Sequence, residues 1–381
     1  MTRKILIAPD SFKGTLSAAE VASAIARGLQ LSFPGCETVE IPMADGGEGT
    51  VDAWVRAVGG GEFITADASD PLGRAIKCRY GSNGDTAVIE LAEASGLTLL
   101  AKSERNPMIT STYGTGMLIR HALDSGVKNI ILGIGGSATN DAGTGMLSAL
   151  GARFTSRGSV LTPGGADLRK LVKIDISEMH PRMHSVRFQA ACDVNNPLCG
   201  PDGASAVYGR QKGATPEMVA ILDAALAHFA DVAERFAFCD HSLRAAPGAG
   251  AAGGTGYALL AFCRAELKSG VRMIADSVKL KKRMKGCDLV ITGEGCFDGQ
   301  TMRGKVPAGV AEIARELGIP VAAICGCRGD GWQKAIDAGF TAVIPASPAG
   351  PPASHDEAMD AVTAAVDHLK YIANPFKPAA I

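Results

Sequence analysis

The chain has 381 residues, with 38 lysines and arginines against 39 aspartates and glutamates, so its formal net charge is −1. This balance excludes the basic excess that a nucleic-acid or membrane-surface partner requires. The length suggests two domains, and abundant glycine with few aromatic residues is typical of a soluble α/β enzyme. No signal-peptide pattern opens the chain, no apolar run approaches the roughly 20 residues of a membrane helix, and the cysteines form no C-x-x-C pair. We therefore expect a cytoplasmic protein with reduced thiols.

The first sixty residues predict a β-α-β unit. Residues 4–8 are a short apolar run that ends before Pro9, which is typical of a buried parallel strand. Ser17 and Glu20 form a capping-box pattern at the start of a helix, and residues 37–42 alternate apolar and charged residues as a second strand. The crossover between the two strands should be right-handed.

The middle of the chain begins with a different pattern. Residues 62–68, 75–81 and 86–92 are short β-like runs separated by turn signals, which predicts an antiparallel meander. Alternating α and β patterns then return: a helix near 114–125, a strand at 129–134, a glycine-rich turn, a helix from about 141, a strand at 187–192 and a helix at 216–236 capped by Thr215.

The last hundred residues predict three more buried strands, at 288–292, 320–325 and 341–345. Helices are expected near 307–317 and 332–338, and Ser354 with Glu357 forms a capping-box pattern before a C-terminal helix.

Five parallel strands, two from the N-terminal and three from the C-terminal end, are the number that a flavodoxin-like sheet needs. We therefore predict an α/β protein with one flavodoxin-like domain built from residues 1–62 and 285–381. Residues 63–284 are expected to form a second, mixed α/β domain inserted into it.

Glycines and acidic residues gather directly after the predicted strands. In open α/β sheets, ligands bind beyond the carboxyl ends of the strands, so these turns are candidate ligand contacts. The turns are the segments 10–15, 44–50, 133–141, 193–195 and 292–295.

The turn at 133–141 is glycine-rich and precedes a predicted helix. Glycines let backbone N–H groups approach a ligand, and a helix N-terminus favours anions, which predicts a phosphate site. The alternative is a tight turn that needs glycine for steric reasons only.

Other nucleotide and hydrolase motifs are incomplete. Gly133, Gly135 and Ala138 match a dinucleotide fingerprint, but residues 142–166 contain no Asp or Glu to hold the ribose. Residues 298–306 have P-loop spacing but end in valine where Ser or Thr should hold magnesium. No G-x-S-x-G elbow is present and no histidine lies in a glycine-rich turn, so a His-based triad is not expected.

Seven blocks of sequence resemble the signature blocks of type-1 glycerate kinases. They run in order along almost the whole chain: DSFKGTLSA (10–18), PMADGGEGT (42–50), GIGGSATNDAGTGM (133–146), CDVNNPLCGPDGA (192–204), YGRQKGA (208–214), GAGAAGGTGYAL (248–259) and DLVITGEGCFDGQTMRGKVPAGVA (288–311). The resemblance implies two α/β domains with the active site in the cleft between them, and ATP, Mg²⁺ and (R)-glycerate as cofactor and substrates. It implies 2-phospho-D-glycerate as the product, with phosphorylation of the 3-hydroxyl as an alternative.

Phosphoryl transfer needs cations for the phosphates, carboxylates for Mg²⁺ and a group that orients or deprotonates the attacking hydroxyl. Lys13, in a glycine-containing loop before a helix, is the first choice for a phosphate or carboxylate contact, and Lys305 is the second. Either could instead be a solvated lysine. Further substrate or phosphate contacts are expected at Ser11, Gly135, Gly136, Ser137 and Asn140.

Five carboxylates share the metal and general-base roles in this interpretation: Asp45, Glu48, Asp193, Glu294 and Asp298. Asp193 ends a buried strand, where an unused charge would be costly, so it is expected to be the base or a metal ligand. Lys13, Asp193 and Asp45 are thus the predicted catalytic residues, and Glu294, Asp298 and Glu48 the predicted metal ligands. Each carboxylate could instead be a cap or turn residue. Asp10, Asn140 and Asp141 are expected to be capping or orienting residues rather than catalysts.

Two other functional classes remain at this point. One is an oxidoreductase on a Rossmann-type sheet, and the other is a non-enzymatic sugar-acid sensor. The many carboxylates argue against the sensor, because binding an acid without metal would need net positive charge. The composition is compatible with a homodimer and does not determine the oligomeric state.

Overall fold

The computed structural model describes residues 2–372 and 376, except residues 163, 237, 238, 348, 349, 351 and 353. The chain divides into two compact units. Unit 1 comprises Met1–Asp45, Asp52–Gly61 and Val271–Ile381, and unit 2 comprises Gly46–Val51 and Glu62–Gly270. No helix among the described residues is long and apolar enough to cross a membrane.

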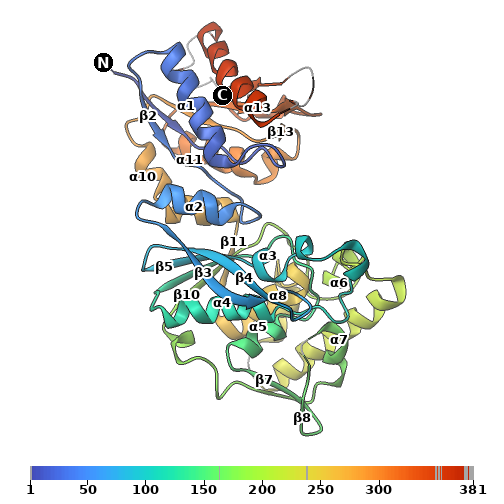
Figure 1. The fold of residues 1–381 in the computed structure, drawn as a ribbon. Helices are drawn as coiled ribbons and strands as arrows, with labels where there is room; N and C mark the ends of the chain where they lie inside the picture. Colours follow the sequence, from blue (N-terminus) through green and yellow to red (C-terminus); the bar gives the residue numbers. More distant parts are fainter. Residues whose placement is uncertain are drawn as a thin grey trace. The chain divides into compact units, whose positions relative to one another are not determined.

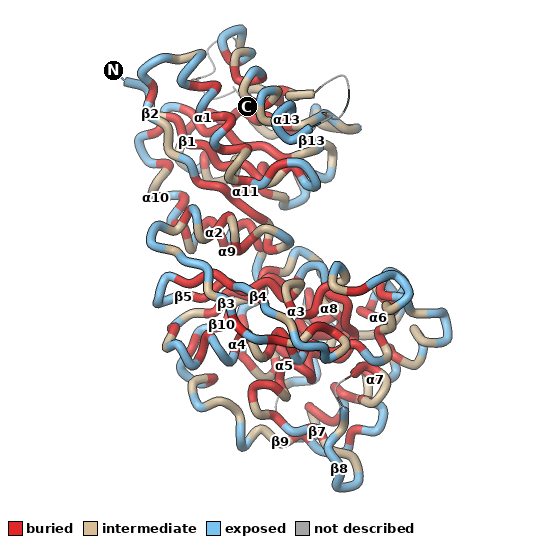
Figure 2. Tube along the Cα trace, in the orientation of Figure 1, coloured by how far each residue is buried: buried red, intermediate tan, exposed pale blue. Residues whose placement is uncertain are grey.

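Unit 1 contains a five-stranded sheet in which every pair of neighbours is parallel. Its order is β16-β14-β12-β1-β2, for β1 (Lys4–Ile7), β2 (Glu37–Glu40), β12 (Leu289–Thr292), β14 (Val321–Cys325) and β16 (Phe340–Pro345). Numbered along the chain, this is the 2-1-3-4-5 order of a flavodoxin-like sheet, so the predicted fold class is confirmed. Strands β12 and β14 are buried throughout, which explains why they are continuous apolar runs. Figure 2 colours much of the interior of unit 1 as buried.

The helices of unit 1 are α1 (Ala18–Ser32), most of α2 (Thr50–Val58), α9 (Gly270–Ser277), α10 (Leu280–Met284), α11 (Val306–Glu316), α12 (Lys334–Asp337) and α13 (His355–Ala365). The Ser17–Glu20 capping box at the start of α1 is present, and the Ser354 hydroxyl accepts a hydrogen bond from the N–H of Glu357 at 3.2 Å. Local sequence signals therefore start both helices where predicted.

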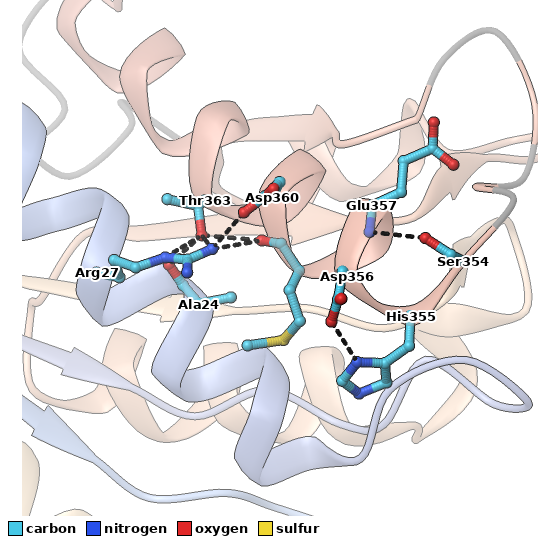
Figure 3. Close-up of polar contacts among 9 residues, drawn as sticks. Ala24, Arg27, Ser354, His355, Asp356, Glu357, Asp360 and Thr363 are labelled. Carbon is cyan, nitrogen blue, oxygen red and sulfur yellow. Dashed lines mark hydrogen bonds and ion pairs between the residues drawn. The ribbon is translucent and has the colours of Figure 1, made fainter.

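Helices α1 and α13 pack against each other (Figures 1 and 3). The Arg27 guanidinium donates to Asp360 at 2.8 Å and to the Thr363 hydroxyl at 2.8 Å. A Cβ at Gly28 would lie 2.5 Å from the Thr363 carbonyl oxygen, so only glycine permits this approach. The close packing holds α1, and with it the loop that precedes it, against the sheet.

Unit 2 contains a six-stranded mixed sheet in the order β11-β10-β6-β5-β4-β3. Its strands are β3 (Glu62–Ser69), β4 (Ala75–Ser82), β5 (Thr86–Glu90), β6 (Asn129–Gly133), β10 (Arg187–Ala191) and β11 (Glu266–Lys268). Strands β3, β4 and β5 pair antiparallel, as the meander pattern predicted, whereas β5, β6, β10 and β11 pair parallel.

The helices of unit 2 include α3 (Ala92–Ser95), α4 (Tyr113–Asp124), α5 (Thr144–Ala149), α6 (Ala204–Tyr208), α7 (Pro216–Arg235) and α8 (Ala251–Cys263). Thr215 caps α7 as expected. Unit 2 also holds a small sheet that the sequence pattern did not predict, made of β7 (Arg153–Ser156), β8 (Ser159–Val160) and β9 (Lys173–Asp175).

The helix expected from about residue 141 begins only at Thr144. Ala142 and Gly143 have left-handed backbones, with φ of 52° and 69°, so they cannot continue a helix. The Asp141 carboxylate instead accepts the N–H groups of Gly143 and Gly145, each at 3.1 Å. A carboxylate-capped turn thus replaces the first helical residues.

Two segments, and Glu62 at a domain boundary, fall in a different unit from the domain expected from sequence. Residues 271–284 belong to unit 1, where the Trp54 indole donates to the Ser277 hydroxyl and the Arg283 guanidinium donates to the Ala57 carbonyl. Residues 46–51 belong to unit 2, where the N–H of Val51 donates to the Glu90 carboxylate at 2.8 Å.

Candidate active site

A cavity of about 550 Å³ lies at the carboxyl ends of the strands of unit 1. Every strand of the sheet contributes to it, because each is followed by a lining residue: Asp10 to Lys13 after β1, Asp45 after β2, Glu294 to Cys296 after β12, Gly326 and Cys327 after β14, and Ala346 and Ser347 after β16. This is the edge at which open α/β sheets bind ligands. The cavity is therefore the candidate active site.

The loop after β1 presents Lys13 to the cavity. Phe12 and Leu16 are buried and exchange backbone hydrogen bonds of 2.8 and 3.0 Å, which closes a tight loop over the intervening residues. Lys13 lies exposed in this loop, beside Gly14 with φ of 78°. Two buried apolar side chains thus anchor a loop that carries an accessible ammonium group at the cavity wall.

Asp10 is a cavity carboxylate that the sequence interpretation treated as a capping or orienting residue. Its side chain is 6% exposed, and its carboxylate accepts the N–H of Ser11 at 2.7 Å. Burial, with the nearby carboxylates of Asp45 and Glu294, raises the pKa of Asp10 to about 7, and Lys13 partly offsets this rise. Near neutral pH this carboxyl group can therefore both give and take a proton. The position directly after a buried strand was the signal that could have found it.

Glu294 and Lys305 form an ion pair on another part of the wall. The Lys305 Nζ lies 3.0 Å from one Glu294 oxygen and 3.9 Å from an Asp298 oxygen. Burial raises the pKa of Glu294, against the opposing effects of the Thr301 side chain and of Lys305. The other oxygen of Glu294, Oε1, is buried without a hydrogen-bond partner among the described residues. This oxygen is available to an incoming ligand.

The glycines that follow β12 and β14 are required by packing. A Cβ at Gly293 would lie 1.9 Å from the Ile324 carbonyl oxygen, and one at Gly326 would lie 2.5 Å from the Gly295 carbonyl oxygen. The two loops therefore touch backbone to backbone, and the N–H of Cys327 donates to the Gly295 carbonyl at 2.9 Å. Steric fit alone therefore explains why these two positions are glycine. The close contact between the two loops also holds Glu294 at the cavity.

The remaining predicted residues lie in unit 2, at the carboxyl edge of its own sheet. Gly133 and Ala191 are paired at the ends of β6 and β10, so the turns after these strands leave the sheet at the same edge. Gly135 and Gly136 are exposed there, and Gly136 has φ of 70°. Their backbone groups are thus accessible, as an anion-binding turn requires.

Ser137 and Asn140 are buried by contrast. The Ser137 and Thr139 hydroxyls are hydrogen-bonded at 2.9 Å, and the Asn140 amide donates to the Ser205 hydroxyl at 3.0 Å. These side chains support the turn from inside, and the buried Lys212 ammonium does the same by donating to the Thr139 carbonyl at 2.6 Å.

Glu48 and Asp193 are both exposed in unit 2. The Asp193 carboxylate accepts the N–H of Gly270 at 3.3 Å. The loop that carries Glu48 packs on the ends of β6 and β10, since a Cβ at Gly46 would lie 2.2 Å from the Ala191 Cβ. Six predicted residues (Ser11, Lys13, Asp45, Glu294, Asp298 and Lys305) therefore line the cavity of unit 1, and six (Glu48, Gly135, Gly136, Ser137, Asn140 and Asp193) gather in unit 2.

No group of three or more His, Cys, Asp or Glu side chains in the described part of the chain is arranged to hold a metal ion. The carboxylates of the cavity thus do not form a complete metal site by themselves. A cation here would need ligands from a bound substrate as well.

Comparison with known proteins decides the family, because the model of the glycerate kinase family matches residues 5–374. The chain belongs to the glycerate kinase family. It is 51% identical to a glycerate kinase of Haemophilus influenzae over 345 residues, which is 90% of each chain. It is 48% identical over 345 residues to a protein of Escherichia coli named glycerate 2-kinase, covering 89% of this chain and 90% of that one.

The fold of this family member also agrees with a solved structure. A crystal structure of a protein assigned as glycerate kinase 2 from Salmonella typhimurium LT2 superposes with a TM-score of 0.89 and is 43% identical, covering 97% of this chain and 98% of that one. The chain is accordingly a kinase, a phosphotransferase with an alcohol group as acceptor.

Proposed function

We propose that this kinase transfers the γ-phosphoryl group of ATP to a hydroxyl of (R)-glycerate, giving 2-phospho-D-glycerate and ADP. The observation that carries the proposal is the set of lysines and carboxylates around one cavity in a chain 48% identical to a glycerate 2-kinase. Phosphoryl transfer depends on positioning and on charge stabilisation. The cavity wall supplies positive side chains for the phosphates and negative side chains for a cation.

The cavity suits the nucleotide better than the acceptor. Its volume of about 550 Å³ lies within the usual range for a drug-sized ligand, whereas glycerate has only three carbons. Ala346, Ala358 and Val362 supply apolar wall for a base, and Lys13 and Lys305 supply charge for phosphates. We therefore place ATP in unit 1.

A Mg²⁺ ion fits this arrangement as a companion of the nucleotide. Mg²⁺ usually takes one or two carboxylates together with phosphate oxygens, and it neutralises charge on the transferring group. The unpartnered Glu294 Oε1 and the neighbouring Asp298 are the side chains that would hold it. Glu48, the third metal ligand expected from sequence, belongs to unit 2.

The Lys305 ammonium has a second use in this scheme. Lys305 pairs with Glu294, and its side chain is 37% exposed. A triphosphate would compete for Lys305, which frees Glu294 for the cation. The ion pair between Lys305 and Glu294 would thus be replaced by a contact of Lys305 with phosphate and a contact of Glu294 with the cation.

The proton of the attacking hydroxyl needs an acceptor. Asp193 and Asp45 are the acids proposed from sequence, and Asp10, with its pKa near 7, is the candidate that the structure adds. Asp10 meets the requirement that a general base be poised near the working pH.

The test is ADP release with D- and L-glycerate and a panel of other hydroxy acids, with and without Mg²⁺, with the product identified by ³¹P NMR. We expect glycerate-dependent and Mg²⁺-dependent ADP together with 2-phosphoglycerate. A 3-phosphoglycerate product would favour the alternative regiochemistry. Release of no ADP with glycerate, or glycerate-dependent reduction of NAD⁺ to NADH, would contradict the proposal.

A further inference from the structure

Two cysteines face each other across the loops that follow β12 and β14. Cys296 lies in β13 (Cys296–Phe297) and Cys327 in β15 (Cys327–Arg328), and these short strands pair in parallel with Cys296 opposite Cys327. Neighbouring strands lie about 4.8 Å apart, and disulfides join Cα atoms about 4.4 to 6.8 Å apart. The backbone therefore holds the two residues at a spacing that a disulfide can span.

Both thiols are free and exposed, and both line the cavity of unit 1. The other cysteines of the chain are buried or only partly exposed. Cys325, two residues before Cys327, is fully buried in β14. A reagent that enters the cavity thus meets two adjacent thiols and no third one from the same strands.

Exchange between a cysteine and a disulfide reagent requires the thiolate form of the cysteine. The thiolate fraction of a cysteine rises with pH, so we expect the exchange to be faster in mildly alkaline solution than at neutral pH.

We propose that Cys296 and Cys327 form an oxidisable thiol pair in the cavity wall, which a small-molecule disulfide converts into an intramolecular disulfide that lowers kinase activity. One cysteine thiolate attacks the reagent and releases its first thiolate. The other cysteine thiolate attacks the mixed disulfide and releases the second. Two cysteine thiols are oxidised as one reagent disulfide is reduced to two thiols, and the two cysteine protons pass to these products.

The expected effect on activity comes from the neighbours of Cys296. Glu294 precedes it by two residues and Asp298 follows it by two, and both line the same cavity. A disulfide between Cys296 and Cys327 would change the shape of the cavity wall between Glu294 and Asp298. This part of the inference rests on the proposed function, whereas formation of the bond does not.

The test treats the full chain with oxidised glutathione at pH 8.5, blocks the remaining thiols and maps the peptides by mass spectrometry. Trypsin leaves Cys287 with Cys296 in residues 286–303, and Cys325 with Cys327 in residues 316–328. Cleavage before Asp288 and Asp298 then separates Cys296 from Cys287. We expect more than half of the molecules to carry a link between these two peptides.

Matched variants identify the cysteines that form the disulfide. Cys296→Ser and Cys327→Ser should each abolish it, and Cys325→Ala should keep it. Each protein is also assayed for ADP release before and after reduction with dithiothreitol. In the unsubstituted chain we expect the linked form to be at least about fivefold slower than the same sample after reduction.

Absence of the linked peptide, its persistence in Cys296→Ser or Cys327→Ser, or complete linkage with an unchanged rate would each overturn the proposal. Linkage is measured on thiols alone. A failure of the chain to phosphorylate glycerate would therefore be recognised separately from a failure of the thiols to join.

Discussion

At the scale of single residues, accessibility separates two kinds of side chain at the strand ends. Lys13, Glu48 and Asp193 are exposed, and a ligand can reach them directly. Ser137 and Asn140 have the same kind of sequence position but are buried and hydrogen-bonded within unit 2. The exposed side chains are suited to contact a substrate. The buried side chains are suited to hold in place the backbone groups that contact it.

Removing the charge of Lys13 or Asp193 should reduce turnover without unfolding the chain. Lys13→Ala and Asp193→Asn are each expected to lower kcat more than tenfold with little change in Tm, because both side chains are exposed. Steady-state kinetics and thermal denaturation measure the two effects, with Lys282→Ala as an exposed-lysine control. Near-normal turnover in either variant would remove that residue from the site.

Lys212 gives a prediction about pH. Burial lowers the pKa of this lysine from 10.5 to about 8, a difference that corresponds to about 3 kcal/mol. Between pH 8 and 10.5 the unfolded chain keeps the Lys212 proton longer than the folded chain, so this group adds stability as the pH rises and is most destabilising below pH 8.

Lys212→Met should therefore be more stable relative to the parent at pH 7 than at pH 10. The lost hydrogen bond to the Thr139 carbonyl offsets part of the gain at both pH values. Urea denaturation of the two proteins at each pH measures the difference. A stability difference that does not vary with pH would show that the Lys212 pKa is not lowered.

At the scale of elements, close backbone approach decides where glycine is required. The approach of α1 to α13 depends on Gly28. Arg27, beside it, and its partner Asp360 (Figure 3) are 50% and 78% exposed. Packing inside the interface and ion pairs at its rim should thus differ sharply in energy.

Gly28→Ala is expected to destabilise the chain by about 1–3 kcal/mol, because its Cβ would overlap the Thr363 carbonyl region and the gain in helix propensity does not compensate. Arg27→Ala should cost less than about 1 kcal/mol, because the Arg27 and Asp360 side chains are 50% and 78% exposed. Chemical denaturation ranks the two variants. A larger loss for Arg27→Ala would contradict this account of the interface.

At the scale of the whole molecule, each of the two main sheets has its own set of turns at the carboxyl ends of its strands. The cavity of unit 1 collects residues from five strands that are far apart in the sequence. Placing ATP in this cavity predicts that the nucleotide stabilises the folded protein by mass action, by about 2.7 kcal/mol at a hundredfold excess over Kd.

Filling the cavity should weaken this effect. Ala346→Trp, at a half-buried lining position, is expected to raise the Kd for ATP at least about tenfold and to reduce the ATP-dependent rise in Tm. Val160→Trp, at an exposed position in unit 2, serves as the control. An undiminished ATP effect in Ala346→Trp would place the nucleotide elsewhere.

The sequence by itself determined the fold class and those elements that have a strong local pattern. Continuous apolar runs marked the buried parallel strands, short β-like runs separated by turn signals marked the meander, and the Ser17–Glu20 pattern marked a helix start. These signals depend on neighbours within a few residues. Whole-chain resemblance indicated the family.

Only the tertiary structure decided which turns share a cavity, which of them are buried, and that Asp10 belongs to the wall. These properties depend on strand order and on backbone approaches between distant segments, such as Gly293 against Ile324. A local pattern carries no information about either, since burial and the charges of neighbours arise only when remote loops meet.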